Sequence, residues 1–457
     1  MAMTLIEGLT RVVRSPGFKF FLVCFLILLL GIPLTIVWLL TQERQDRANT
    51  ARSEIAQHWG AKQALQGPYL VVPYSVKVFQ TVDDKKTFST HERYAIFLPE
   101  KLEVTGDTST EVRRRSIYDT TVYTAKMKLS GKFSSPNFRN IEQGDSTIRW
   151  RDAFIALSIS DVSGLKESAE LVVNNKHVPF EPSLGLPGVY RNGINARLNP
   201  EETAKNQALK PFDFSIDLVF AGSSALQIAP AGRETHVELK SDWPHPSFIG
   251  AFLPVSHDLR SDGFKATWRV PHLARSVPQA WAINANSGGA FNKLTSYTFG
   301  VNYFQPIDYF NLVNRAAKYG MMFLSVAFLA VFTLELTSSK RVHPVQYVFV
   351  GLAMILFYIL LLSLSEHIGF LLAYIIASCA TGGMLSLYVG MALSNRMRGL
   401  IMLGIFLVLY TLLYLILRLQ DYALLAGAIA GFVMLTVTMF ATLRINWSSG
   451  EPATSGR

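Results

Sequence analysis

The charged residues that stand out in this chain lie beside long apolar runs. Glu335 ends one such run and is followed within a few positions by Lys340, Arg341 and His343. Because ionisable side chains are costly in a hydrocarbon layer, a carboxyl group at this position marks either an interfacial ion pair or a functional site. Two interpretations are open: a local ion pair with the basic cluster, or a coupled site that moves protons or senses a partner.

A second polar pair, Glu366-His367, lies between two later apolar runs. These side chains could couple an exported domain to the membrane segment, or they could cap two helices and face water. Together with Glu335 and Tyr358 they would form the polar path of a translocator. No predicted span carries a charge near its middle, and this argues against an ion-coupled transporter.

A third candidate is the segment 243–254, which is apolar and contains three prolines. Such a segment cannot be an ordinary central strand, because proline lacks the N–H that a ladder requires. Trp243, His245, Phe248 and Phe252 could present aromatic groups to a lipid, a peptide or a partner protein. The alternative is a structural loop packed across the end of a β-sandwich.

The sequence has none of the motifs that would assign catalysis. It lacks a phosphate-binding glycine loop, a His-Glu-x-x-His zinc motif, a Gly-x-Ser-x-Gly nucleophile turn and a calcium loop. The two cysteines, Cys24 and Cys379, lie in apolar runs and exclude a thiolate zinc site. We therefore expect no enzyme activity, no cofactor and no metal.

The composition indicates a membrane protein. Of 457 residues, 50% are hydrophobic and only 17% are charged, which is too apolar for a soluble enzyme of this length. The net charge of +10 does not indicate nucleic-acid binding, because the basic excess clusters beside the apolar runs. Membrane topology explains this charge distribution.

Six apolar runs are long enough to cross a hydrocarbon layer of about 30 Å. Lys and Arg in the short connections fall on one side of the membrane when the spans alternate, so the positive-inside rule places both termini in the cytoplasm. The predicted organisation is a cytoplasmic N-terminus (1–19), an uncleaved transmembrane anchor (20–40), an exported stalk (41–68), an exported β-rich domain (69–315), a bundle of five transmembrane helices (319–443) and a cytoplasmic tail (444–457).

The exported region alternates apolar and polar residues in short stretches that are rich in β-branched and aromatic residues. We expect strands near 69–79, 93–98, 116–123, 126–129, 153–159, 171–174, 212–220, 226–228, 235–239, 264–270 and 298–301. Glycine-containing turn signals separate them, among others Gly106-Asp107 and Gly131. The fold class is therefore an α + β membrane protein whose exported part is a sandwich-like, mostly antiparallel β domain.

Rows of small residues recur in the C-terminal runs. Ser378, Gly382, Ser386 and Gly390 repeat every fourth residue, a spacing that lets two membrane helices approach closely. We interpret this row as helix packing, since a substrate groove would need polar groups converging on it.

Several blocks of the chain closely resemble the CreD family of bacterial inner-membrane proteins. The most specific block runs from His343-Pro344-Val345-Gln346-Tyr347 through Ser363-Leu364-Ser365-Glu366-His367. Further similarity lies in Trp59-Gly60 with Gly67-Pro68, in Trp243-Pro244-His245-Pro246-Ser247-Phe248, and in Gly300-Val301-Asn302-Tyr303-Phe304-Gln305-Pro306. The resemblance extends from about residue 57 to about residue 440.

The resemblance implies a Gram-negative inner-membrane protein that supports cell-envelope integrity. It also implies production under a two-component envelope-stress response and a link to tolerance of colicins and β-lactams, with no known catalytic activity, cofactor or transported substrate. The favoured hypothesis is a non-catalytic factor whose periplasmic domain binds an envelope lipid, glycan or protein. The alternatives are a translocator of a lipid or small solute, or a sensor that signals from periplasm to cytoplasm. Membrane lipids are the expected surroundings, and the oligomeric state stays open.

Overall fold

The structure is a computed structural model of residues 1–457, and the chain divides into two compact units. One unit comprises Met1–Ala48 with Ile307–Arg457, and the other comprises Asn49–Pro306. We call them the membrane unit and the β unit and describe each by itself. The structure describes residues 16–82, 85–139, 141, 146–187, 189, 191–198, 209–283, 288–303, 309–336, 338, 340, 342–419 and 423–442.

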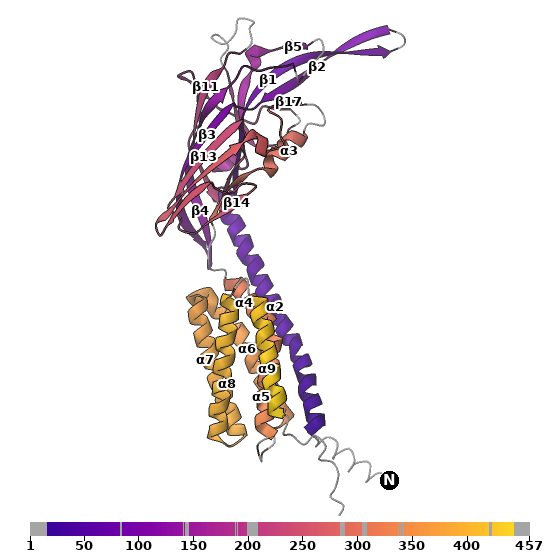
Figure 1. The fold of residues 1–457 in the computed structure, drawn as a ribbon, viewed down its shortest axis with the longest axis vertical. Helices are drawn as coiled ribbons and strands as arrows, with labels where there is room; N and C mark the ends of the chain where they lie inside the picture. The colour runs from indigo at the N-terminus through magenta and orange to yellow at the C-terminus, as the bar shows by residue number, and fades with distance from the viewer. Residues whose placement is uncertain are drawn as a thin grey trace, which may run out of the picture. The chain divides into compact units, whose positions relative to one another are not determined.

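The membrane unit is built of helices, and all but the short, amphipathic α4 are apolar and run side by side (Figure 1). They are α2 (Pro16–Trp59), α4 (Tyr309–Lys318), α5 (Gly320–Leu336), α6 (Pro344–Ile368), α7 (Phe370–Ala392), α8 (Arg396–Arg418) and α9 (Ala423–Thr442). Over the described residues, α2, α6, α7 and α8 are each long and apolar enough to cross a membrane, and α4 with α5, bent by 48°, supplies a fifth candidate span. The count of six spans therefore stays a prediction.

The part of α2 that belongs to the membrane unit is packed into it along one face. Val23, Leu26, Leu30, Leu34 and Val37 are all less than 8% exposed, and their spacing of three and four residues is that of a helix face. Gly320 and Gly351 receive this face, because a side chain at either position would overlap Leu34 or Leu30. The predicted anchor is thus an integral helix of the bundle.

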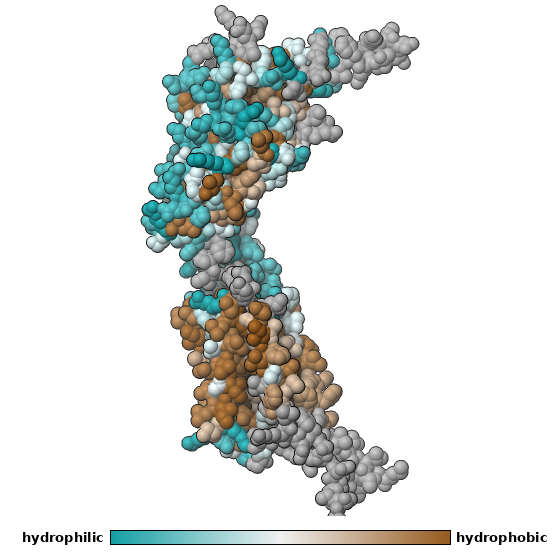
Figure 2. Space-filling model, viewed as in Figure 1, coloured by the Kyte–Doolittle hydropathy of each residue, from teal (hydrophilic) through white to brown (hydrophobic). Residues whose placement is uncertain are grey.

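The outward faces of these helices are apolar as well. Figure 2 shows the surface of this unit as predominantly hydrophobic, and the large exposed side chains include Phe21, Leu28, Leu387, Leu407 and Phe432. A helix with apolar residues on all sides suits a lipid environment, where burial against protein and exposure to acyl chains are equally favourable.

The small residues of α7 pack against α8 as expected. Gly390 lies against Gly399, where an added Cβ would be 3.1 Å from the facing Cα, and Gly382 lies against the Tyr410 ring. Gly369 ends α6 and starts α7 with a φ of 79°, a backbone conformation that favours glycine. The tight connection at Glu366-His367 depends on this residue.

The β unit contains two sheets. The ten-stranded sheet has the order β14 (Pro246–Gly250), β18 (Phe299–Tyr303), β12 (Ala225–Ile228), β1 (Gln63–Val82), β6 (Phe154–Ile159), β10 (Gly193–Arg197) and β9 (Glu181–Pro182), with β2 (Lys85–Phe97) and β5 (Ser146–Ile148) also paired to β1 and β17 (Ala280–Ile283) paired to β2. The eight-stranded sheet has the order β15 (Ser256–Arg260), β16 (Gly263–Pro271), β13 (Glu234–Ser241), β3 (Lys101–Arg115), β4 (Tyr118–Phe133), β11 (Phe212–Ser223), β7 (Glu170–Val173) and β8 (Lys176–Pro179). Most pairs are antiparallel, and the pairs β1–β12 and β3–β13 are parallel.

The two sheets pack face to face around one aromatic core. Trp268 from the eight-stranded sheet is fully buried, and its ring centroid lies 5.6 Å from that of Phe299 and 5.7 Å from that of Phe248 on the other sheet. Tyr123 and Tyr303 meet in the same way at 4.7 Å. The predicted sandwich-like, mostly antiparallel class agrees with this architecture.

Two predicted turns are instead parts of long strands. Gly106 lies inside β3 and Gly131 inside β4. A side chain at Gly106 would overlap Met127 and Leu239, and one at Gly131 would overlap the Lys101 carbonyl oxygen. These glycines permit close approach of neighbouring strands, which is the other meaning of glycine in a strand. A short helix, α3 (Gly288–Ser296), was also not predicted.

The last turns of α2 belong to the β unit. Glu54 Oε2 lies 2.8 Å from Arg115 Nη2, and the Arg113 guanidinium lies 4.4 Å from the centroid of the Trp59 ring. The Trp59 indole N–H donates to the Tyr123 carbonyl at 3.4 Å. Gly60 ends the helix, and a Cβ there would lie 2.5 Å from the Ala221 carbonyl oxygen. Of the predicted stalk (41–68), residues 41–59 are therefore helical with their end fastened to β3 and β4, and residues from 63 onward already belong to β1.

Because the β unit has its own core, we expect residues 49–306 to fold when produced alone. In that fragment Trp268→Ala should lower the free energy of unfolding by about 3–5 kcal/mol, since it leaves a large cavity between the sheets. Leu273→Ala is the matched control, because this side chain is 86% exposed and its loss should change stability by less than about 0.5 kcal/mol. Denaturant unfolding followed by tryptophan fluorescence would measure both values, and equal effects of the two substitutions would contradict the packing described.

Candidate functional site

Glu335, at the end of α5, forms the centre of a buried polar site in the membrane unit. Glu335 is 5% exposed, and both of its carboxylate oxygens have polar partners. Oε1 pairs with Lys19 Nζ and accepts the Val342 backbone N–H at 2.9 Å, while Oε2 accepts the Tyr347 hydroxyl at 2.8 Å. Lys19 Nζ also donates to the Val342 carbonyl at 2.8 Å. The carboxylate therefore joins α2, α5 and α6.

This arrangement satisfies the requirements of a charge in a low-dielectric environment. A buried carboxylate is tolerated when an opposite charge and further hydrogen bonds replace the water it has lost. Lys19 supplies the charge with a side chain that is 20% exposed, and Tyr347 and Val342 supply the remaining donors. Removal of the lysine would leave the carboxylate buried without a compensating cation.

Two members of the basic cluster that follows Glu335 have other partners. Lys340 donates to Ser394 Oγ at 2.6 Å and is exposed. His343 caps the start of α6, where its Nδ1 accepts the Val345 N–H at 3.3 Å and Gln346 completes a capping box. Arg341 lies outside the described residues, so a local ion pair with it stays a prediction. The cation that the described residues place on Glu335 is Lys19, far away in the sequence.

Glu366, near the end of α6, is a second buried carboxylate. Its side chain is 7% exposed and its Oε2 lies 4.0 Å from Arg44 Nη1 on α2. Its Oε1 is buried and accepts no hydrogen bond within the described part of the chain. His367 beside it is exposed. The two residues therefore have different surroundings, and of the pair only Glu366 is held inside the unit.

The two carboxylates bind the same helix at two points. Lys19 and Arg44 are 25 residues apart in α2, which corresponds to about 38 Å along a helix. A bilayer with its headgroup regions is about 40–45 Å thick. The ion pairs Lys19–Glu335 and Arg44–Glu366 are thus spaced to lie near opposite membrane interfaces.

The interior between these ends is filled by aromatic side chains. Tyr358 is 3% exposed, and its neighbour Phe357 packs its ring 4.7 Å from Tyr410 and 5.7 Å from Tyr374. The internal void lined by Phe323, Met354, Phe357, Tyr358, Phe406, Leu409, Tyr410 and Leu413 has a volume of only about 10 Å³. This is scarcely room for one water molecule, so Tyr358 is part of a closed core.

The segment 243–254 contributes an edge strand, not a loop across the sandwich. Residues 246–250 form β14, which pairs with β18 at one edge of the ten-stranded sheet. Phe248 and Phe252 pack on the core beside Trp268 and Phe299, and the Trp243 indole donates to the His245 carbonyl at 3.1 Å. Of the four candidates His245 alone is classed as exposed. The aromatic rings thus serve packing, and the exposed apolar side chains next to them are Leu253 and Val255.

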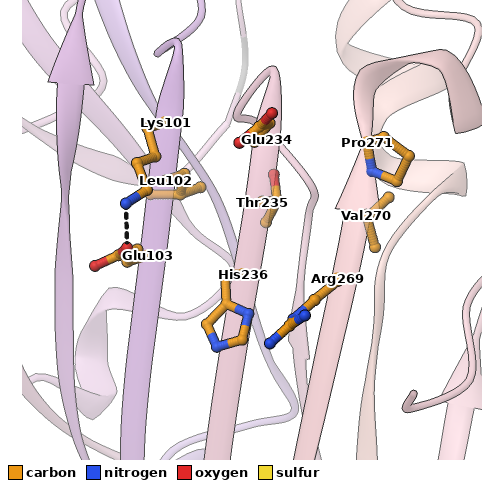
Figure 3. A pocket seen from close by; sticks show the side chains of 9 residues that line it. All are labelled: Lys101, Leu102, Glu103, Glu234, Thr235, His236, Arg269, Val270 and Pro271. Atoms are coloured by element: carbon orange, nitrogen blue, oxygen red, sulfur yellow. Dashed lines mark ion pairs between the residues drawn. The ribbon is translucent and has the colours of Figure 1, made fainter.

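A shallow hollow of about 500 Å³ lies on the outer face of the eight-stranded sheet (Figure 3). Its polar side chains come from β3, β13 and β16, and they include the charged Lys101, Glu103 and Arg269 and the imidazole of His236. Lys101 Nζ lies 2.6 Å from Glu103 Oε1, and this hydrogen bond lowers the pKa of the Glu103 carboxyl. Both signs of charge are exposed and mixed, so the hollow has no preference for one ligand charge.

The histidines and acidic residues of the described part of the chain were compared with the grouping that a metal site needs. Among the described residues, no group of three or more His, Cys, Asp or Glu side chains is arranged to hold a metal ion. His236 lies on β13, His257 on β15 and His272 in the turn after β16. The expectation that the chain uses no metal stays a prediction for the whole chain.

Arg275 is a buried charge that the sequence did not reveal. It is 5% exposed and donates to the carbonyls of Ala231 and Gly232 at 3.1 and 3.2 Å and to Gln279 Oε1 at 3.0 Å. Burial lowers the pKa of its guanidinium to about 10. Its donors hold the connection between β16 and β17 in place, which is a structural role.

The fold and these sites define a multi-pass membrane protein with a large β domain. A family model described as "Inner membrane protein CreD" matches residues 15–448. The chain is 31% identical over 422 residues to "Inner membrane protein CreD" of Escherichia coli (strain K12), a match that covers 92% of this chain and 91% of that protein. The chain belongs to the CreD family of inner membrane proteins, and the resemblance drawn from its residues is confirmed.

If the Lys19–Glu335 pair holds α2 in the bundle, Lys19→Met should be more harmful than the loss of both charges. We expect the single substitution to destabilise the membrane unit by about 3–5 kcal/mol, because an unpaired carboxylate remains buried. The double variant Lys19→Met/Glu335→Gln should recover part of this loss. Thermal unfolding of the full chain in lipid nanodiscs measures the order of stabilities.

Lys340→Met is the matched control, because it removes an exposed lysine near the same end of the bundle. It should unfold at nearly the wild-type temperature. If Lys19→Met behaved like Lys340→Met, the ion pair would not carry the role assigned to it.

Proposed function

We propose that this protein is a non-catalytic envelope-integrity factor of the inner membrane. Its β unit binds an envelope lipid, glycan or protein in the periplasm, and the membrane unit anchors it and responds to the bound state. The observation that carries the proposal is the single helix α2, which is fastened by charged side chains within both units. The family's link to envelope integrity gives the proposal its biological setting.

The continuity of α2 supports coupling. The helix runs without interruption from Pro16 to Trp59, and the boundary between the two units falls inside it, after Ala48. On one side of that boundary it pairs with Glu335 and Glu366, and on the other with Arg115. Pro33 removes one backbone hydrogen bond in the membrane part, but between Arg44 and Glu54 the helix contains neither proline nor glycine. This stretch can pass displacement across the boundary, because its backbone hydrogen bonds resist bending.

The closed interior of the bundle argues against translocation. A solute path needs polar groups that converge on an open space, and the described interior is an aromatic core with a void of about 10 Å³. The buried carboxylates Glu335 and Glu366 lie at the helix ends and face basic residues of α2. Carboxylates at these positions are better placed to hold α2 in the bundle than to pass an ion through it.

The proposed topology can be tested by cysteine labelling. In a background with Cys24→Ser and Cys379→Ser, we introduce Ser256→Cys in β15 or Arg396→Cys at the start of α8, both at exposed positions. A membrane-impermeant maleimide added to cells with a permeabilised outer membrane should label the cysteine at 256 at once. The cysteine at 396 should react only after the inner membrane is opened, and the reverse pattern would contradict periplasmic placement of the β unit.

Coupling is tested by interrupting α2 at the unit boundary. A flexible Gly-Ser-Gly-Ser insertion between Ala48 and Asn49 should leave both units folded but abolish the β-lactam tolerance of cells that depend on this chain. The reason is that a flexible linker transmits neither tilt nor twist.

The same insertion between Ser261 and Asp262, in the exposed turn between β15 and β16, is the control and should preserve tolerance. Membrane insertion of all variants is checked by quantitative immunoblotting of washed membranes. Full tolerance with the interrupted helix would exclude coupling through α2 and leave anchorage as its role.

A further inference from the structure

A groove on the surface of the membrane unit has the size and position of a lipid site. It lies between α7 and α8 and has a volume of about 560 Å³, within the range of about 300–1,000 Å³ that small-ligand sites occupy. Both helices are long and apolar enough to span a membrane. The groove therefore opens toward the hydrocarbon layer.

The groove is preformed by contacts between the two helices. The Tyr374 hydroxyl donates to the Tyr410 carbonyl at 2.6 Å, and the Tyr410 hydroxyl lies 3.0 Å from Thr381 Oγ1. Among the lining residues, Phe406 packs its ring on that of Tyr410, and Tyr374 packs on Tyr414. Such fixed walls need no rearrangement to receive a ligand.

Its width suits one acyl chain and not a helix. The lining residues of α8 extend from Leu403 to Tyr414, which is about 17 Å along the helix axis. A volume of about 560 Å³ over this length gives a mean cross-section of about 33 Å². A transmembrane helix about 10 Å in diameter has a cross-section of about 80 Å², so the groove fits an acyl chain better than a helix of a second copy of the chain.

One end of the groove carries a positive charge. Tyr414 lines the groove there, and Arg418 Nε donates to its hydroxyl at 3.1 Å. The exposed guanidinium is placed one helical turn beyond the lining residues, where a phosphate attached to the chain in the groove would lie. Arginine matches phosphate in both charge and geometry.

We propose that the groove between α7 and α8 binds one phospholipid, with an acyl chain between the helices and its phosphate on Arg418. The small residues Gly382 and Gly383 line the groove and make room for the chain. The site is independent of ligand binding by the β unit, and it would make a membrane phospholipid a stoichiometric component of the folded protein.

Two glycines provide a matched pair of variants. An added Cβ at Gly383, which lines the groove, or at Gly404, which does not, meets no atom within 4 Å. Gly383→Leu should fill the groove without disturbing the helices, and Gly404→Leu adds the same side chain to the exposed surface of α8. The full chain is released from nanodiscs of phosphatidylethanolamine and phosphatidylglycerol and examined by native mass spectrometry.

The wild-type chain should retain one phospholipid, and Gly404→Leu should do the same. Gly383→Leu should reduce the retained fraction about tenfold or more, equivalent to a loss of about 1.4 kcal/mol. The proposal would be overturned if the two variants retained phospholipid equally or lost it equally. It would also be overturned if the wild-type chain were a dimer that Gly383→Leu converts to monomers. If Gly383→Leu does not fold, Cys379→Phe is the substitute, because it fills the same groove from one turn earlier on α7. Its phospholipid retention is measured in the same way and should fall as for Gly383→Leu.

The headgroup is tested separately. Arg418→Gln should reduce phospholipid retention while leaving binding of added methyl palmitate, an acyl chain without negative charge, unchanged, and Arg396→Gln at the other end of α8 should affect neither. If the wild-type chain retained methyl palmitate but no phospholipid, the groove would bind an acyl chain alone and the assignment to a phospholipid would be wrong.

Discussion

The packing of the membrane unit depends on the partners of the buried Glu335 carboxylate. A carboxylate that is 5% exposed inside an apolar bundle requires a cation and several donors, and here they come from α2, from the start of α6 and from the connection that precedes it. This requirement draws the N-terminal helix into contact with helices that begin some 300 residues later. The sequence places the anchor first and the bundle last, but the carboxylate makes them one unit.

Helix α2 is held at several points along its length. Lys19 and Arg44 fasten its membrane part, a stripe of aliphatic residues packs between them, and Glu54 and Trp59 fasten its last turns to the β unit. The helix therefore packs into the bundle and does not merely tether the β unit. The described interior of the bundle is an aromatic core, and we propose that the bundle responds to α2 and binds one phospholipid in the groove between α7 and α8.

The sequence predicted what depends on local pattern. Apolar length placed the helices, alternation placed most strands, and the Ser-Leu-Ser-Glu-His block identified the family. The partner of Glu335 could not be predicted, because Lys19 is 316 residues away and the nearer basic residues Lys340 and His343 were equally plausible. The buried face of α2 could not be predicted either, because residues that face lipid are as apolar as residues that are buried against protein. Gly106 was misread as a turn because a glycine that allows close strand packing looks the same in sequence as one that allows a turn.

The most direct test of this account is disulfide formation between α2 and α6 in native membranes. With Cys24→Ser and Cys379→Ser as background, Leu30→Cys and Gly351→Cys place two thiols where the Leu30 side chain meets Gly351. We predict nearly complete cross-linking under mild oxidation, and a marked decrease when Lys19→Met is added. Cross-linking of the same rate and extent with and without Lys19 would contradict the claim that the buried ion pair holds the anchor helix in the bundle.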